Sequence, residues 1–124
     1  MNRTALAVVT DLFFVAKLQG VARSAGVTLH VAAPATAANA CETLAPDVVL
    51  VDLHSTAELP LLLQALKRAT SAPLIGFYSH VDGETRRIAL ESGIDRAMPR
   101  SAFVTRLAEL LTGNIAPATS EEHP

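Results

Sequence analysis

The stretch Pro46-Asp47-Val48-Val49-Leu50-Val51-Asp52-Leu53 predicts the fold of this chain. Its apolar run, residues 48–51, shows no alternation of polar and apolar side chains, which is typical of a parallel strand covered by helices on both faces. Asp52 follows this run at the carboxyl end of the expected strand. Ligands of open α/β sheets bind in the crevice outside the carboxyl ends of the strands, so we expect Asp52 to lie where the chemistry takes place.

Strand-like runs alternate with helix-like runs along the chain, which is the pattern of a parallel sheet with crossover helices. The expected strands are 5–9, 27–32, 48–53, 73–78 and 95–98. The expected helices are 14–25 before Gly26, 35–44 before Pro46, one that begins at Pro60, one between Asp82 and Gly93, and one from Ser101 to Gly113. Right-handed crossovers favour the strand order 2-1-3-4-5. We therefore predict an α/β fold with a doubly wound, five-stranded parallel sheet of the flavodoxin-like (βα)5 type.

The size and composition of the chain place it in one domain. A chain of 124 residues, half of them hydrophobic, is long enough to bury a core without disulfides or metals. We assign residues 1–113 to this domain. Residues 114–124 are rich in Pro, Ala, Thr, Ser and Glu and have little to bury, so we expect a disordered tail there.

Charge, hydropathy and cysteine content exclude several classes of function. The net charge of −2 gives no electrostatic case for binding nucleic acid or an acidic membrane surface. No apolar stretch reaches the roughly 18 residues of a membrane span, and no secretory signal is recognisable, so a cytoplasmic protein is expected. The single cysteine, Cys41, excludes an internal disulfide and is expected as a small buried hydrophobe rather than a reactive thiol.

Two carboxylates are expected to meet at the carboxyl edge of the sheet. In the predicted order the first and third strands are neighbours, which brings Asp11 and Asp52 into the same crevice. Carboxylates so placed repel one another unless a cation lies between them, and Mg²⁺ takes one or two protein carboxylates while it keeps several waters. The crevice is therefore a candidate site for Mg²⁺ and a phosphoryl group. His54 and His80 flank it without metal-ligand spacing, so we interpret them as solvated loop histidines.

These residues resemble a known family. Over residues 6–111 the sequence is similar to the receiver domain of response regulators, the CheY-like family, and residues 46–53 look like the phosphoacceptor strand of that family. The resemblance implies a CheY-like fold. It also implies that Asp52 accepts a phosphoryl group from a histidine kinase or a phosphotransfer protein.

Further site residues follow from the same resemblance. Asp11 matches the acidic residue that binds Mg²⁺ directly, and Asp52 together with the backbone carbonyl of His54 would complete the protein ligands of the metal. Ser79 matches the hydroxyl residue that hydrogen-bonds the acyl phosphate. Gly93-Ile94-Asp95 looks like the Gly-Ala-Asp of the family.

The sequence also departs from the family at three positions. Thr10 stands where a second acidic residue is usual, which leaves the expected metal site one negative charge short. Arg100, followed by Ser101, stands where the family has lysine followed by proline. Arginine also binds phosphate oxygens, but its longer, flatter head does not replace a compact ammonium in a tight crevice. Ala97 occupies the place of an aromatic residue that rotates inward on activation, so that switch cannot operate here.

Each candidate also has an ordinary structural interpretation that the sequence leaves open. Asp52 fits a turn former, Asp11 the N-cap of the first helix, Ser79 a loop serine and Arg100 a surface arginine. The run Leu12-Phe13-Phe14-Val15 has two interpretations as well. It either fills the core and the rim of the crevice, or it forms an exposed patch on which a partner docks.

Three hypotheses of function follow. In the first, the chain is a single-domain receiver that is phosphorylated on Asp52 with Mg²⁺ and signals through a downstream protein partner or through homodimer formation. In the second, it is a pseudo-receiver that binds its partner independently of phosphorylation, which Thr10, Ala97 and Arg100 favour. In the third, it is a flavodoxin-like cofactor binder, which residues 12–15 oppose because they offer no phosphate-binding loop. No nucleophile elbow or Walker-type loop is present, so we do not expect an enzyme.

Overall fold

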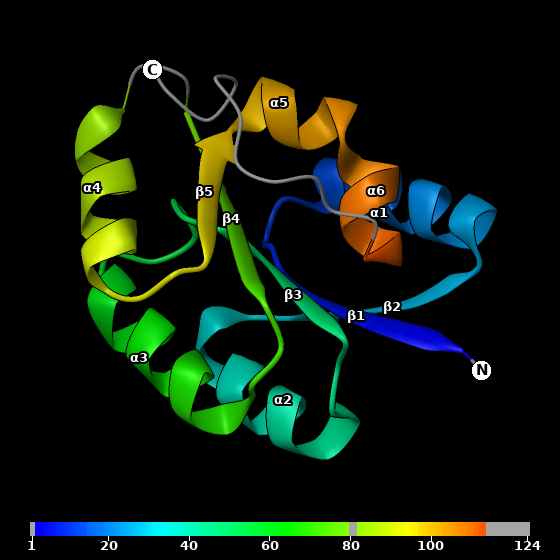
Figure 1. Ribbon diagram of the computed structural model, residues 1–124, viewed down its shortest axis with the longest axis horizontal. Coiled ribbons are helices and arrows are strands. Elements are labelled where there is room, and N and C mark those ends of the chain that lie inside the picture. The colour runs from blue at the N-terminus through cyan, green and yellow to red at the C-terminus, as the bar shows by residue number, and fades with distance from the viewer. Residues whose placement is uncertain (1, 80–81, 114–124) are drawn as a thin grey trace.

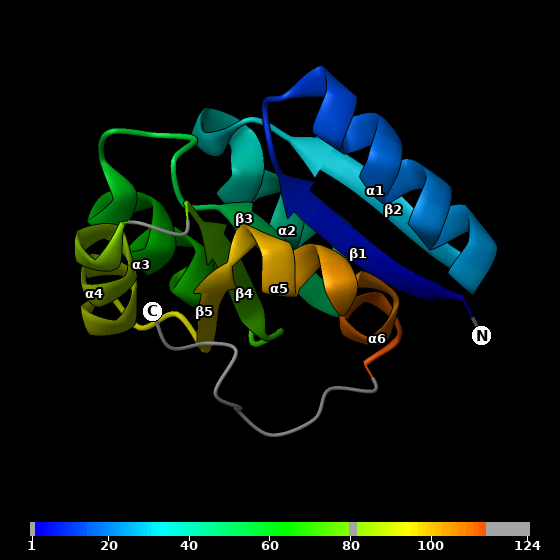
Figure 2. The ribbon, with the colours of Figure 1, turned by 90° about the horizontal axis from the view of Figure 1, so that it is seen from above.

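A parallel sheet lies between two layers of helices in the computed structural model, which describes residues 2–79 and 82–113 (Figures 1 and 2). The strands are β1 (Arg3–Val8), β2 (Val27–Ala32), β3 (Val48–Asp52), β4 (Leu74–Tyr78) and β5 (Arg96–Pro99). The helices are α1 (Leu12–Ala25), α2 (Ala37–Leu44), α3 (Leu59–Ala69), α4 (Gly83–Glu91), α5 (Arg100–Thr105) and α6 (Leu107–Thr112), with a 3₁₀ turn η1 (Pro34–Thr36) before α2. The predicted tail and His80 lie outside the described residues.

The strand order is β2-β1-β3-β4-β5 with every pairing parallel, which confirms the predicted topology. Val8 pairs with Val51 across β1 and β3, and Asp52 pairs with Phe77 across β3 and β4. All carboxyl ends therefore lie at one edge of the sheet. The expected strands were placed within about two residues of the observed ones, as is usual for element boundaries.

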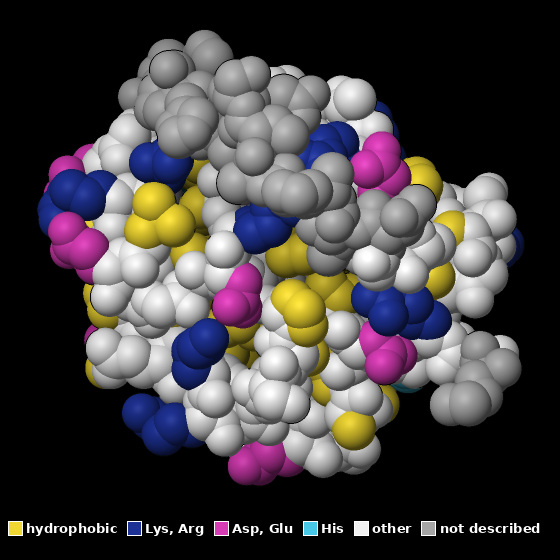
Figure 3. Space-filling view, viewed as in Figure 1, with side chains coloured by type: hydrophobic (Ala, Val, Ile, Leu, Met, Phe, Trp, Pro, Cys, Tyr) yellow, Lys and Arg dark blue, Asp and Glu magenta, His cyan; other side chains and the backbone are white. Residues whose placement is uncertain are grey.

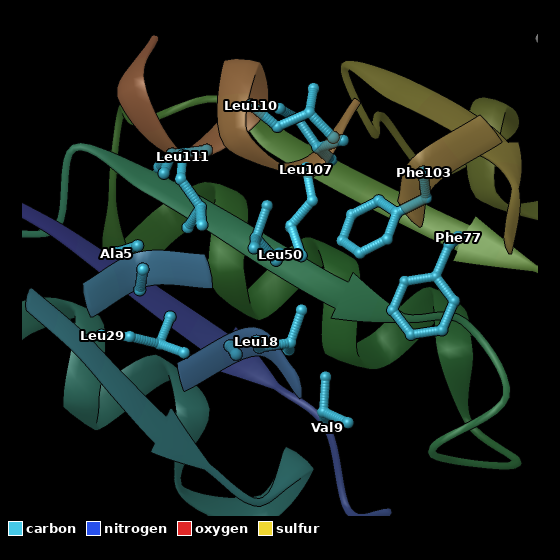
Figure 4. Packing of buried hydrophobic residues seen from close by; sticks show 14 of the residues in the cluster. Ala5, Val9, Leu18, Leu29, Leu50, Phe77, Phe103, Leu107, Leu110 and Leu111 are labelled. Atoms are coloured by element: carbon cyan, nitrogen blue, oxygen red, sulfur yellow. The ribbon is translucent and has the colours of Figure 1, made fainter. Parts of the chain in front are cut away.

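Two apolar clusters hold the helices on the sheet. On one face α1, α5 and α6 pack over alternate strand residues such as Ala5, Leu50 and Phe77, together with Phe103 and Leu107 (Figure 4). On the other face, α2, α3 and α4 pack over the intervening strand residues. Because β3 is covered on both sides, residues 48–51 are fully buried, which is why this strand shows no alternation of polar and apolar side chains.

The helix ends follow local sequence signals. Asp11 caps α1 at its start, and Gly26 closes it in the left-handed conformation with φ of 73°. Asp82 caps α4, and Gly113 closes α6 with φ of 81°. The third helix begins at Leu59, one residue before the predicted start, so Pro60 still lies in the first turn, where its missing N–H has no cost.

The prediction of a single helix from Ser101 to Gly113 is wrong, because this segment forms two helices. The backbone at Arg106 departs from helical geometry, with φ of −104° and ψ of 12°, and divides the segment into α5 and α6. The hydroxyl of Thr105 donates to the carbonyl of Ser101 at 3.0 Å, a type of bond that bends helices. No proline or glycine marks the position, so the bend has no signal in the sequence.

Cys41 is buried in α2, as predicted, and burial raises the pKa of its thiol. Among the described residues, no helix combines the length and apolarity that a bilayer crossing requires. On the face drawn in Figure 3, Lys and Arg side chains are interspersed with Asp and Glu, as expected for a chain with a net charge of −2.

Candidate functional site

The candidate residues gather at the carboxyl edge of the sheet because each follows the end of a parallel strand. Asp11 comes after β1, Asp52 ends β3, Ser79 follows β4 and Arg100 follows β5. His54 lies two residues beyond Asp52, in the loop that leads to α3. The topology thus brings together the residues that the sequence predicted for one crevice.

Asp11 serves as the N-cap of α1. Its Oδ1 accepts hydrogen bonds from the backbone N–H groups of Phe13 at 2.9 Å and Phe14 at 3.2 Å. A cap of this kind satisfies N–H groups that the first turn of a helix leaves unpaired. The structural interpretation of Asp11 is therefore correct, and it leaves the second carboxylate oxygen, Oδ2, available to a ligand.

Asp52 is half-buried at the end of β3, and its carboxylate turns back onto the chain. Its Oδ1 accepts a hydrogen bond of 2.9 Å from the backbone N–H of His54, and its carbonyl accepts one of 3.0 Å from the N–H of Ser55. These bonds shape the turn after β3. Among the residues that the structure describes, neither Asp52 nor Asp11 forms an ion pair.

The side chain of His54 bridges two loops, a contact that the sequence does not predict. Its Nε2 accepts a hydrogen bond of 2.9 Å from the backbone N–H of Ser79, and its Nδ1 lies 3.9 Å from Oδ2 of Asp82. His54 is a loop residue with 40% of its side chain exposed, as predicted, but the prediction did not include its hydrogen bond with Ser79. The sequence does place a histidine two residues after the candidate phosphoacceptor. That spacing alone does not indicate which residue the imidazole contacts.

Asp82 takes part in this contact while it caps α4. Its Oδ1 accepts from the backbone N–H of Thr85 at 3.0 Å, and its Oδ2 accepts from the Thr85 hydroxyl at 2.7 Å. These hydrogen bonds, with a smaller contribution from His54, lower the pKa of Asp82 below its ordinary value. Asp82 is thus held as a carboxylate beside the imidazole.

Arg100 rests on an aromatic surface rather than on a carboxylate. Its guanidinium carbon lies 4.1 Å from the ring centroid of Phe14 and 5.7 Å from that of Phe77. Phe14, Phe77 and Phe103 form a continuous ring cluster, with centroid separations of 4.6 to 6.2 Å. The stacking links the starts of α1 and α5 to the end of β4.

Residues 12–15 divide between the two interpretations that the sequence left open. Phe14 is buried and Val15 is half-buried, so these two belong to the core. Leu12 and Phe13 are 81% and 91% exposed and lie directly after Asp11. An exposed apolar pair thus lies next to Asp11 at the carboxyl edge of the sheet.

The available donors fit a hard cation. Asp11 and Asp52 each have one carboxylate oxygen without a hydrogen bond among the described residues, and backbone carbonyls such as that of His54 are oxygen ligands of the type Mg²⁺ accepts. Within residues 2–79 and 82–113, no three His, Cys, Asp or Glu side chains cluster as a metal site. Two carboxylate oxygens suit an ion that takes few protein ligands and keeps its waters, and Thr10 adds no charge to them.

Solved structures with the same fold are receiver domains of response regulators. The receiver domain of TorR, the TMAO respiratory system response regulator, is 23% identical, with a TM-score of 0.74 over 90% of this chain and 98% of that domain. A CheY-like receiver domain protein from Methanospirillum hungatei JF-1 is 18% identical, with a TM-score of 0.76 over 92% and 94% of the two chains. CheY4 of Vibrio cholerae is 14% identical, with a TM-score of 0.72 over 90% of this chain and all of that one.

No protein-family model matches the sequence, and no match was found among curated proteins. The structural matches confirm the predicted fold and its likeness to CheY-like receiver domains. With identities below 25%, the likeness is one of fold. The roles of Asp11, Asp52, His54, Ser79 and Arg100 remain predictions.

Proposed function

We propose that this chain is a single-domain receiver in phosphorelay signalling, and that Asp52 accepts the phosphoryl group. The observation that carries the proposal is the position of Asp52 in a receiver-type fold, at the end of the central strand and without an ion-pair partner among the described residues. Its neighbours at the same edge, Asp11, Ser79 and Arg100, supply charge and hydrogen bonds of the kind that phosphoryl transfer needs.

The transfer begins with the Asp52 carboxylate as the nucleophile. One of its oxygens attacks the phosphorus of a phosphohistidine on a histidine kinase or phosphotransfer protein, so a P–O bond forms and the P–N bond breaks. The electron pair of that bond leaves with the donor imidazole nitrogen. The hydrogen bond that the His54 N–H donates to Oδ1 of Asp52 keeps the carboxylate oriented during the attack.

Mg²⁺ would be held by Asp11, Asp52 and the backbone carbonyl of His54, and when bound it would offset the negative charge of the phosphoryl oxygens. Arg100 supplies a second cation. Its guanidinium is planar and binds phosphate oxygens in pairs, and its stacking on Phe14 holds it at the crevice before the phosphoryl group arrives. The Ser79 hydroxyl would donate a hydrogen bond to the acyl phosphate.

The donor is a protein that carries a phosphohistidine, and the output partner is a second protein or a second copy of this chain. Leu12 and Phe13 offer an exposed apolar surface next to Asp11, which suits a protein that must place a phosphohistidine over the crevice. Output through a downstream protein or through a homodimer is consistent with a chain in which the described residues form one domain.

Intact-mass spectrometry after incubation with acetyl phosphate, with and without Mg²⁺, tests the proposal. We expect a Mg²⁺-dependent addition of one phosphoryl group to the wild type and none to Asp52→Asn. Asp47→Asn is the matched control, because Asp47 lies just before the same strand at the opposite edge, where its carboxylate accepts from the N–H of Thr4. Equal addition to wild type and Asp52→Asn would refute the role of Asp52.

A phosphorylation-independent pseudo-receiver is the alternative. The observations that favour it are Thr10 in place of a second acid, Arg100 stacked on Phe14, and Ala97, whose small buried side chain provides no ring to rotate. This alternative predicts no phosphoryl addition under conditions that modify a control receiver. It also predicts a stable complex with a partner whose affinity is the same with and without acetyl phosphate and Mg²⁺.

A further inference from the structure

His54 connects the candidate phosphoacceptor to the end of β4 through two hydrogen bonds. Its backbone N–H donates to Oδ1 of Asp52 at 2.9 Å, and its imidazole Nε2 accepts from the backbone N–H of Ser79 at 2.9 Å. Both bonds belong to one residue. Asp52 therefore fixes the backbone of His54, and the side chain of His54 fixes Ser79.

The second ring nitrogen faces the start of α4 but lies beyond hydrogen-bond distance of it. Because Nε2 accepts a hydrogen bond, the ring proton resides on Nδ1, which lies 3.9 Å from Oδ2 of Asp82. Asp82 also donates its backbone N–H to the carbonyl of Ser79 at 2.9 Å, and its carboxylate caps α4 through Thr85. The backbone of Ser79 is thus held at both its N–H and its carbonyl.

We propose that His54 is a positioning residue that couples the state of the Asp52 carboxylate to the backbone of Ser79 and to the first turn of α4. This inference rests on the proposed function, because phosphorylation is the event that changes Asp52. The imidazole carries this coupling between the two loops, in addition to the β3–β4 pairing that joins Asp52 to Phe77.

The physical basis is the strength of the acceptor at Asp52. An ionised carboxylate oxygen accepts a stronger hydrogen bond than a neutral carbonyl oxygen does. When Asp52 becomes an acyl phosphate, the oxygen that accepts from His54 loses its share of the carboxylate charge. The backbone of His54 is then held less firmly, its imidazole loses its fixed position, and Ser79 is released to turn toward the phosphoryl group.

A double-mutant cycle measured by amide hydrogen exchange in NMR tests this coupling without a phosphodonor. Asp52→Asn replaces the charged acceptor by a neutral amide oxygen and so imitates the loss of charge. We expect Asp52→Asn to accelerate exchange at the Ser79 amide by about two- to fivefold, and His54→Ala to accelerate it by roughly fivefold, as the loss of one hydrogen bond implies. In the His54→Ala background, Asp52→Asn should change the Ser79 rate by less than about 1.5-fold, because the path is already interrupted.

Two controls separate coupling from general destabilisation. His54→Gln places an amide oxygen where Nε2 lies, so it should restore the slow exchange at Ser79 and its response to Asp52→Asn. The Thr4 amide, bonded to Asp47 at the opposite edge of the sheet, should exchange at the same rate in every variant. An equal effect of Asp52→Asn with and without His54, or an unchanged Ser79 rate in His54→Ala, would overturn the inference.

The failure of this inference is distinct from the failure of the proposed function. Absent phosphoryl addition in the mass measurement would contradict the receiver role of Asp52. An additive cycle in the exchange measurement would contradict the coupling through His54, whether or not Asp52 is phosphorylated.

Discussion

Gly76, in the middle of β4, provides a sharp test of how the sheet supports the candidate site. It pairs with Val51 on one side and Ala97 on the other. A Cβ atom added at Gly76 would lie 2.6 Å from Cδ1 of Ile94, 2.6 Å from Cδ2 of Leu53 and 2.8 Å from Cγ of Leu53. These separations are far below van der Waals contact, so Gly76→Ala forces the two side chains to move.

The neighbours have little room to yield. Leu53 is 2% exposed and Ile94 is 6% exposed, and both belong to the cluster under α3 and α4. Overpacking of a core of this kind destabilises by about 1–3 kcal/mol. With a urea m-value of roughly 1–3 kcal/mol/M for a small domain, the unfolding midpoint should fall by about 0.3–3 M. Because Leu53 directly follows Asp52, we also expect slower phosphoryl addition.

Urea unfolding followed by circular dichroism measures the effect, with Gly20→Ala as the matched control. Gly20 lies inside α1, and a Cβ there would meet no atom within 4 Å. The control variant should be stabilised by up to about 1 kcal/mol, because alanine favours a helix over glycine. A Gly76→Ala protein as stable as the wild type, or shifted in the same direction as Gly20→Ala, would refute the packing argument.

Three further predictions concern the edge of the sheet. Asp11→Asn should retain the α1 cap and full stability but lose Mg²⁺-dependent phosphoryl addition. Asp11→Ala should lose this addition as well, and its free energy of unfolding in urea should fall by about 1 kcal/mol. Equal stability losses in the two variants would contradict separate capping and metal-binding roles of Asp11. Arg100→Gln should slow phosphoryl addition in the mass assay more than Arg100→Lys, which keeps the charge, and an unaltered rate in Arg100→Gln would exclude a role for the guanidinium. Because the hydrogen bonds from Thr85 lower the pKa of Asp82, the stability that Asp82 contributes is present above its unfolded pKa of about 4 and is lost as the pH falls through its lower folded pKa. Urea unfolding of wild type and Asp82→Ala between about pH 5 and about pH 2.5 should therefore show a shrinking difference on acidification, and a growing one would reverse the assigned sign.

Much of the fold was predictable because its signals are local or general. The unbroken apolar run 48–51 indicated a strand buried on both faces, and the handedness of crossovers then fixed the strand order. Asp11, Gly26 and Asp82 marked helix ends through chemistry within a few residues of each position. The bend at Arg106 escaped prediction, because it accompanies a hydroxyl bond from Thr105 that no helix-breaking residue announces.

The sequence by itself determined which residues stand at the carboxyl edge of the sheet, because that position depends only on where the strands end and on their parallel order. Only the tertiary structure decided which residues distant in the chain those side chains contact. His54 meets Ser79 across 25 residues, and Arg100 meets Phe14 because the starts of α5 and α1 lie over the same face of the sheet. Such contacts depend on side-chain rotamers and on the distance between loops, which are set when the helices pack on the sheet and which no spacing along the chain encodes.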